Sequence, residues 1–176
     1  INKKQNFTVN FALIKNNSPI FGLISQPYTG NIWYNFKGKA WRLENNQNFE
    51  NAQRIQCNKI DYNNLKILSS FDHRSIELEN WISFVNPVSD QDIGSSIKFC
   101  YLAEGQVDFY PRTSLTMEWD IAAGHSIVKA AGGNIVSSSG LEMRYGKENF
   151  KNRNFLAYGL TDNLPCKFIL NLSYTN

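Results

Sequence analysis

The sequence predicts an α/β protein in which antiparallel hairpins are followed by a mixed sheet with helices packed against it. Two patterns support this prediction. Between residues 7 and 43, four short apolar runs are joined by tight turns, which is typical of antiparallel strands. From residue 65 onward, strand-like runs alternate with helical periods, as they do in layered α/β folds. We therefore divide the chain into residues 1–64 and residues 65–176.

The first part is predicted to form two β-hairpins. Apolar residues alternate with polar ones over 7–13, and a second apolar run at 20–24 follows the turn sequence KNNSP. A further pair of runs, at 31–36 and 39–43, flanks a short Gly-containing connection, which suits adjacent antiparallel strands. Residues 44–64 are polar and rich in Asn, so we expect a loop there with one short strand.

The second part is predicted to alternate strands with helices. We expect a strand at 65–70, helices at 76–84 and 96–104, a strand at 107–110, a helix at 120–131 and a strand that starts at 134. The helices are identified by apolar positions three and four residues apart. Gly105 and the pair Gly132-Gly133 end two of these helices, at positions where a left-handed residue is favoured. Pro111 is expected to end the strand before it.

Composition favours a soluble globular protein. The chain has 176 residues, of which 42% are hydrophobic and 14% aromatic, so it can bury a core at the usual size of one domain. The net charge is +3 and the Lys and Arg residues are scattered, which argues against nucleic-acid binding but is sufficient for a small anionic ligand. No apolar run approaches the roughly 18 residues of a membrane span.

Cysteine usage points to a reducing compartment. Cys57, Cys100 and Cys166 form no CxxC pair, and no His stands at metal-ligand spacing from them. An odd number of cysteines would leave one unpaired in a disulfide framework. We therefore interpret them as reduced thiols of the core and expect a cytoplasmic protein.

A carboxylate stands at the start of the last predicted helix, in the stretch EWDIAAGHSIVKAAGG. Asp120 is well suited to cap that helix, because Asp accepts backbone hydrogen bonds and its charge favours the positive helix end. A metal ligand is the alternative, because the Ala and Gly residues that follow would let the helix approach its neighbours and hold Asp120 rigidly. We interpret His125, inside the same helix, as a packing residue.

Other candidate residues lie at strand ends or helix starts of the second part. Gly94, Ser95 and Lys98 open a predicted helix, where free N–H groups, hydroxyls and an ammonium could bind a phosphate. A Ser cap beside a solvated Lys is the alternative. His73 follows one predicted strand and Arg112 ends another, where α/β proteins bind ligands. Together they predict an anion site with one metal-capable carboxylate, although a single Asp cannot hold two metal ions.

Several of these segments resemble one protein family. WDIAAGHSIVKAAGG is similar to the C-terminal signature of the inositol-monophosphatase superfamily, in which a Trp-Asp pair opens a helix rich in Ala and Gly. SSFDHR, GSSIKFCYLAEG and DFYPR resemble segments of its 3'(2'),5'-bisphosphate nucleotidases of the CysQ type, as does the closing segment 140–159. The likeness covers the whole chain and implies a layered α/β sandwich. Residues 1–64 would be the remainder of the antiparallel metal-binding domain, and 65–176 the C-terminal nucleotide-binding domain.

The resemblance implies a Mg²⁺-dependent phosphatase that removes the 3'-phosphate of adenosine 3',5'-bisphosphate and leaves AMP. Matched by position, Asp120 would bind the metal near the scissile phosphate. Substrate contacts would come from Ser70, His73, Gly94, Ser95, Lys98 and Arg112. Two alternatives stay open: an inositol monophosphatase on the same scaffold, and a non-catalytic domain that binds a nucleotide or a protein partner.

The sequence departs from the family pattern in two places. The DPxDGT motif and an upstream Glu, which supply the other metal ligands and a water-activating Thr, have no counterpart, and the chain starts at Ile1 without Met. We therefore expect the C-terminal part of a longer enzyme, inactive by itself, with a cut sheet edge that favours formation of homo-oligomers. Asp72 stands where relatives often have Ser before the His, and an acid that faced a phosphate dianion would be unfavourable.

Overall fold

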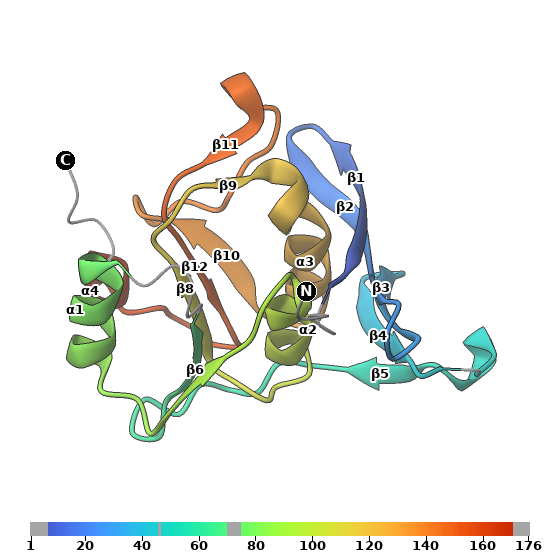
Figure 1. Ribbon diagram of the computed structural model, residues 1–176, viewed down its shortest axis with the longest axis horizontal. Helices are drawn as coiled ribbons and strands as arrows, with labels where there is room; N and C mark the ends of the chain where they lie inside the picture. Colours follow the sequence, from blue (N-terminus) through green and yellow to red (C-terminus); the bar gives the residue numbers. More distant parts are fainter. Residues whose placement is uncertain (1–6, 46, 70–74, 171–176) are drawn as a thin grey trace, which may run out of the picture.

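The protein is built of two β-sheets, with helices between them and on one outer side (Figure 1). The computed structural model describes residues 7–45, 47–69 and 75–170. An antiparallel sheet comes first in the sequence, and a mixed sheet is formed by the residues that follow. The α/β fold class predicted from the sequence is therefore confirmed.

The first sheet contains strands β1 to β5 in the order in which they occur in the sequence, all antiparallel. They are β1 Val9–Lys15, β2 Ser18–Gln26, β3 Asn31–Phe36, β4 Lys39–Leu43 and β5 Gln53–Ile55, with the 3₁₀-helix η1 Phe49–Asn51 before β5. Both predicted hairpins are present, and their tight turns hold Asn16 and Lys37 at positive φ. Alternate residues, such as Ile24, Trp33 and Ala40, are buried in the core between the sheets.

The second sheet has the strand order β10-β12-β8-β6-β7. Its strands are β6 Lys66–Ser69, β7 Ser89–Asp92, β8 Phe109–Arg112, β10 Asn134–Ser137 and β12 Phe155–Tyr158. β6 runs parallel to β7 and β8, whereas β12 runs antiparallel to β8 and β10. The carboxyl ends of β6, β7 and β8 therefore lie at one edge. A separate two-stranded ribbon is formed by β9 Thr116–Met117 and β11 Lys151–Asn152, which follows the 3₁₀-helix η3 Glu148–Phe150.

Three strands of this sheet differ from the sequence prediction: β7 and β12 were not predicted, and β8 runs further than predicted. β7 was not expected, because its sequence SDQD has no apolar residue, and it is an edge strand held by pairing with β6. β8 includes Pro111 and runs on to Arg112, where the sequence predicted an end at the proline. Within the described residues β8 pairs with β6 through Phe109 alone. The N–H that Pro111 lacks therefore interrupts no ladder on that side.

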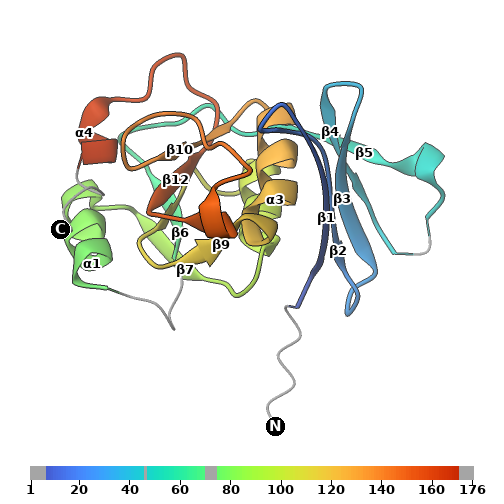
Figure 2. The same ribbon diagram turned by 90° about the horizontal axis from the view of Figure 1, so that it is seen from above.

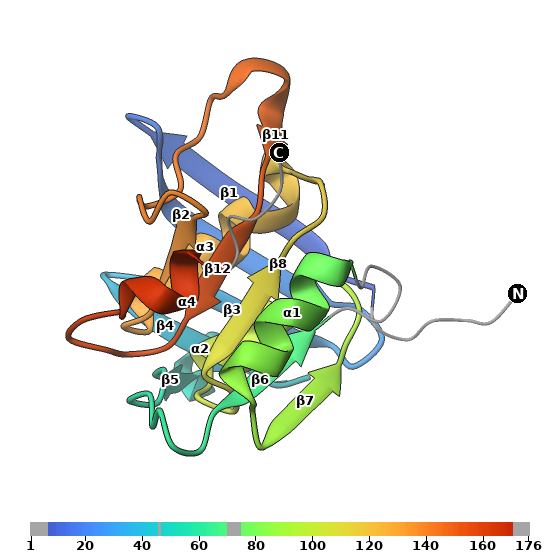
Figure 3. The ribbon, with the colours of Figure 1, turned by 90° about the vertical axis from the view of Figure 1, so that its left-hand side faces the viewer.

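The helices of the described part form two layers (Figures 2 and 3). They are α1 Ile76–Val85, α2 Ile97–Ala103, α3 Glu118–Ala130 and α4 Cys166–Leu170. α2 and α3 lie between the sheets, and α1 and α4 lie on the far side of the second sheet. α3 begins at Glu118, two residues before the predicted start. Within the described ranges, no helix has the length and apolarity that crossing a membrane requires.

The small residues of α3 have a steric explanation. A Cβ atom on Gly22 of β2 would lie 2.3 Å from the carbonyl oxygen of Ala123, so the sheet backbone contacts the helix backbone directly. On another side of the helix, a Cβ atom on Gly124 would lie 2.3 Å from the ring of Phe99 in α2. α3 is therefore in close contact with both the first sheet and α2, and larger side chains at these positions would separate the layers.

Buried side chains fill the spaces on both faces of the second sheet. One cluster surrounds α3 between the sheets, and another joins the second sheet to α1 and α4 through Trp81, Phe109 and Phe168. His125 is fully buried and is within hydrogen-bonding distance of Tyr145, which confirms its interpretation as a packing residue. The cysteines are free thiols, but Cys166 is exposed. The expectation that all three belong to the core was wrong for this residue, because it starts the surface helix α4.

Candidate functional site

The carboxyl edge of the second sheet brings together the ends of three strands. Ser69 ends β6 and is in register with Asp92, which ends β7, while Arg112 ends β8 on the other side of β6. The Oγ atoms of Ser75, which caps α1, and Thr113, which follows β8, are 2.9 Å apart. Sequence reasoning predicted ligand binding at such an edge. The described candidate residues follow or end these strands, except Asp120, which lies in α3 after β9.

Gly94 and Ser95 form the exposed turn between β7 and α2. Ser95 adopts a left-handed conformation with φ of 59°, and its Oγ accepts a hydrogen bond from the Ile97 N–H at 3.4 Å. Ser96 immediately precedes α2, but its Oγ donates instead to Asn10 of β1 at 2.7 Å. The turn is thus tied to both sheets, while the backbone of Gly94 and Ser95 remains accessible to a ligand.

Lys98 is a buried cation, whereas the alternative interpretation of this position required a solvated one. Its residue is 3% exposed, and its Nζ donates to the Ile93 carbonyl oxygen at 2.6 Å. The ammonium also lies over the ring of Tyr110, 5.0 Å from the ring centroid. Burial, and to a smaller extent the nearby Arg112, lowers the pKa of Lys98 to about 8. A buried Lys is unusual unless a partner compensates its charge.

Arg112 places a second positive charge near Lys98. After burial, its charge is the second cause that lowers the pKa of Lys98, and its side chain lies on the same face of β8 as that of Tyr110. Two cations this close repel each other, which is unfavourable unless an anion lies between or beside them. Asp92, at the end of β7, acts in the opposite direction on the pKa of Lys98. The edge is therefore electropositive where Lys98 and Arg112 meet.

Asp120 is the third residue of α3 and is exposed. Its Oδ2 accepts a hydrogen bond from the Met117 N–H at 2.7 Å, so the carboxylate caps the helix from inside its first turn. Sequence reasoning placed Asp120 at the helix start itself, whereas Met117 holds the cap position. Burial is the main cause that raises the pKa of Tyr110 to about 12, and the charge of Asp120 adds to it last among the causes.

The donor set at this edge fits Mg²⁺ in part. An exposed carboxylate is a suitable Mg²⁺ ligand, because this ion is commonly bound by one or two carboxylates together with waters and substrate phosphates. Within the described ranges, however, no group of three His, Cys, Asp or Glu residues is close enough together to hold a metal. Asp120 therefore fits as one contributor to a metal site, and any other protein ligands would have to come from elsewhere.

Two of the predicted substrate contacts, Ser70 and His73, lie outside the described residues, as does Asp72. The flanking residues on both sides are described. Ser69 donates from its Oγ to Asp90 at 2.7 Å at the end of β6, and Ser75 starts α1 beside Thr113. The structure therefore describes the surroundings of Gly94, Ser95, Lys98, Arg112 and Asp120 alone among the predicted site residues, and the binding role of all seven stays a prediction.

Sequence reasoning missed two residues that shape this region. Tyr110 was noted only as part of the strand-end segment that contains Arg112, yet its ring centroid lies 5.0 Å from the Nζ atom of Lys98. Glu118 is buried, and its carboxylate accepts hydrogen bonds from the Gly146 and Lys147 N–H groups at 2.8 and 2.9 Å. The only signal for Glu118 was an acid directly before the Trp-Asp pair, a pattern that does not reveal a partner about thirty residues later in the chain.

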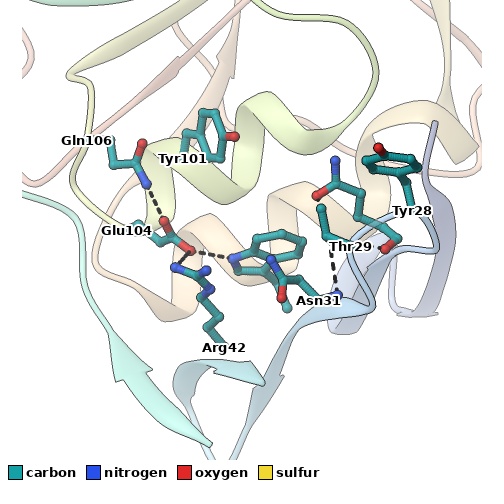
Figure 4. A pocket seen from close by; sticks show the side chains of 9 residues that line it. Tyr28, Thr29, Asn31, Arg42, Tyr101, Glu104 and Gln106 are labelled. Atoms are coloured by element: carbon teal, nitrogen blue, oxygen red, sulfur yellow. Dashed lines mark hydrogen bonds and ion pairs between the residues drawn. The ribbon is translucent and has the colours of Figure 1, made fainter. Parts of the chain in front are cut away.

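A separate pocket of about 340 Å³ lies at the opposite end of α2 (Figure 4). Arg42 and Glu104 form an ion pair at 3.4 Å within it, and the indole N–H of Trp33 donates to Glu104 at 2.6 Å. Its complete lining is Gln26, Tyr28, Thr29, Asn31, Trp33, Arg42, Tyr101, Glu104 and Gln106. Because its cation is already paired with two carboxylates, of Glu104 and Glu44, this pocket offers less to a phosphate than the strand edge does.

Comparison with known proteins identifies relatives of the chain. A bisphosphate nucleotidase, CysQ of Salmonella typhimurium, is 35% identical over 156 residues, which are 88% of this chain and 61% of that protein. CysQ of Buchnera aphidicola is 34% identical over 163 residues, which are 91% of this chain and 60% of that protein. The chain thus spans about three fifths of the length of these curated relatives.

Solved structures agree with the sequence relatives. CysQ from Bacteroides thetaiotaomicron, described as a bacterial member of the inositol monophosphatase family, has a TM-score of 0.80 at 30% identity. The alignment covers 91% of this chain and 65% of that one. An inositol monophosphatase from Zymomonas mobilis shares the fold, with a TM-score of 0.77 at 17% identity over 96% of this chain and 63% of that one. The family model for inositol monophosphatases matches residues 1–163. The chain therefore belongs to the inositol monophosphatase family.

Proposed function

We propose that the protein containing this chain is a Mg²⁺-dependent 3'(2'),5'-bisphosphate nucleotidase that acts on adenosine 3',5'-bisphosphate in the cytoplasm and releases AMP and phosphate. The observation that supports this best is the pair of cations, Lys98 and Arg112, beside the accessible turn of Gly94 and Ser95. A substrate with two phosphate groups needs more positive charge than one with a single group. The CysQ relatives support the same substrate class.

The residues of this chain would bind and orient the substrate. Lys98 and Arg112 would neutralise phosphate oxygens, and the N–H groups at the Gly94–Ser95 turn would donate to them. Asp120 would hold Mg²⁺ through the carboxylate oxygen that does not cap α3. When bound, the metal would supply charge stabilisation for the phosphoryl group and for the leaving oxygen. We assign no residue of this chain the task of activating water.

The proposal is tested by comparing two substrates with the full-length protein. Phosphate release from adenosine 3',5'-bisphosphate and from inositol 1-phosphate should be measured with Mg²⁺ present. We expect the higher kcat/KM on the nucleotide. An equal or higher value on the inositol ester would support the inositol monophosphatase alternative, and no release from either would support a non-catalytic binding domain.

A further inference from the structure

Tyr110 lies beneath the two cations of the candidate site. Its residue is 4% exposed, and its ring centroid is 5.0 Å from the Nζ atom of Lys98. Arg112 stands two residues further along β8, so its side chain lies on the same face of the sheet, and its guanidinium lowers the pKa of the phenol against the larger raising effect of burial. Because a guanidinium has only donors, the phenol oxygen is the atom that can accept a hydrogen bond from it. A single buried side chain therefore presents its ring to one cation and its hydroxyl to the other.

The ring of Tyr110 is itself held by aromatic neighbours. The Phe99 ring of α2 lies 5.1 Å from it at 67°, and the Phe155 ring of β12 lies 5.6 Å from it at 90°. Edge-to-face contacts of this kind are favourable and restrict rotation of the ring. Lys98 has one further anchor, the Ile93 carbonyl oxygen. The position of the ammonium is thus determined by packed groups rather than by solvent.

We propose that Tyr110 is a positioning residue for phosphate binding, whose ring holds the Lys98 ammonium and whose hydroxyl holds the Arg112 guanidinium toward the same anion. This role rests on the proposed function, since it requires that the strand edge binds a phosphate ester. Tyr110 touches neither the metal nor the substrate in this role. It acts through the two cations.

Physical chemistry explains why such a support would matter. Lys and Arg side chains have many rotamers, and two neighbouring cations would otherwise move apart into solvent. A ring face attracts an ammonium, and a phenol oxygen accepts from a guanidinium, so both charges are held close together before the ligand arrives. Ordering them in advance lowers the entropy cost of binding. Burial is the first cause that lowers the pKa of Lys98, and the charge of Arg112 is the second, which is consistent with this proximity.

Two substitutions separate the two parts of the side chain. Tyr110→Phe keeps the ring over Lys98 and removes the acceptor for Arg112, so we expect the Kd for adenosine 3',5'-bisphosphate to rise about 10-fold. Tyr110→Leu removes both contacts and should raise the Kd about 100-fold. Phe109→Leu is the matched control, because Phe109 is a buried aromatic residue of the same strand that packs on Trp81 and Phe168 instead. It should lower the thermal midpoint while changing the Kd less than 3-fold, by roughly the scatter expected for indirect effects.

The binding measurements should use the full-length protein and calorimetry, with inositol 1-phosphate as a second probe. If the protein prefers the inositol ester, the proposed substrate is wrong, but the Tyr110 variants should still weaken binding of that ester.

A double-mutant cycle gives the sharper test. In a Lys98→Met, Arg112→Met background, Tyr110→Leu should change the Kd no further, because the groups through which it acts are gone. A loss of affinity in Phe109→Leu equal to that in Tyr110→Leu would overturn the inference. So would an undiminished effect of Tyr110→Leu in the background that lacks both cations.

Discussion

Lys98 carries a charge that depends on pH within an accessible range. Its pKa of about 8 lies below the ordinary value, because of burial first and Arg112 second. The ammonium is therefore mostly charged at pH 7 and becomes neutral as the pH rises through about 8. Asp92 opposes the shift, and the neighbouring Tyr110, whose pKa is about 12, stays neutral over this range.

The corresponding prediction is that nucleotide affinity falls above about pH 8. The second ionisation of a phosphate group, near pH 6, is complete below that range, so the change would belong to the protein. Calorimetric titrations at several pH values should show the fall in the native protein. They should show a flat profile, with weaker binding throughout, in Lys98→Met. A native profile without the fall would mean that Lys98 does not contact the anion.

Asp120 caps α3 with one oxygen and, by our proposal, binds metal with the other. In the full-length protein, Asp120→Asn keeps an oxygen for the Met117 N–H, so the free energy of unfolding should change little. Its turnover should fall by orders of magnitude, because the ligand charge is lost. Asp120→Ala is the informative partner, since it should also cost about 1 kcal/mol of stability through the lost cap. Normal turnover of Asp120→Asn at saturating Mg²⁺ would leave only the capping role.

His125 makes the stability of the fold sensitive to acid. Burial lowers its pKa to about 4, and it is surrounded by Tyr145, Asn134, Glu142 and Lys129. The unfolded chain binds a proton near pH 6.5, whereas the native protein does so only near pH 4. Stability should therefore fall as the pH drops through this window, by about 3 kcal/mol in all. Chemical denaturation at several pH values should show that the free energy of unfolding of His125→Gln changes less with pH in this window than that of the native protein. The same pH dependence in both proteins would mean that His125 is not the group that titrates.

The packing of α3 gives a prediction at the level of elements. Ala normally stabilises a helix relative to Gly by roughly 0.5–1 kcal/mol. At Gly124, however, the added Cβ would lie 2.3 Å from the buried ring of Phe99. We expect Gly124→Ala to lose about 1–3 kcal/mol of unfolding free energy instead. The double variant Gly124→Ala, Phe99→Leu should be less destabilised than the sum of its single variants, and simple additivity would indicate that the two residues do not collide.

Most elements with an apolar pattern could be predicted from the sequence, although the apolar strand β12 was not. The hairpins of β1 to β4 and the helices α1, α2 and α3 match their predicted segments within a few residues. β7 lacks any apolar residue and depends on a neighbour far away in the sequence, so no local pattern revealed it. β8 can continue through Pro111 because Pro111 pairs with β12 and, within the described residues, not with β6. The strand order of the sheet decides this, and the local sequence does not show it.

The sequence indicated where the candidate residues lie in the fold, but not which side chains they contact. Gly94, Lys98, Arg112 and Asp120 were chosen because they lie near predicted strand ends or helix starts, where α/β proteins bind ligands. The sequence could not show that Lys98 is buried against Tyr110, since residues 98 and 110 belong to different elements. The metal-binding role of Asp120 stays a prediction, and its capping contact could be expected from residue type alone.

For the whole molecule, we predict that a chain of these 176 residues binds nucleotide weakly and hydrolyses none at saturating Mg²⁺. Asp120 is one ligand where two ions would need several, so added metal should not restore turnover. Phosphate release and calorimetry on one pure sample would measure both properties. Metal-dependent hydrolysis by this chain would show that it holds ligands that we have not identified.

The same chain should also associate with itself. β1 is an edge strand, and Val9 and Phe11 are 57% and 54% exposed on it. Unpaired backbone groups beside exposed apolar side chains favour pairing with a second copy. Light scattering should show a mass that rises with concentration in the native chain. Val9→Lys and Phe11→Lys together should keep it monomeric, and unchanged association would exclude β1 as the contact.

The direct backbone contact between Gly22 and Ala123 has a consequence for how the molecule opens. Residues 121–128 of α3 are buried between the first sheet and α2, so the amide protons of this stretch can reach water only when these layers separate. In deuterated solvent they should exchange at a rate set by global unfolding, and denaturant should accelerate all of them with the same steep slope. The amides of β1, on the open edge, should instead exchange through small local openings that denaturant hardly affects.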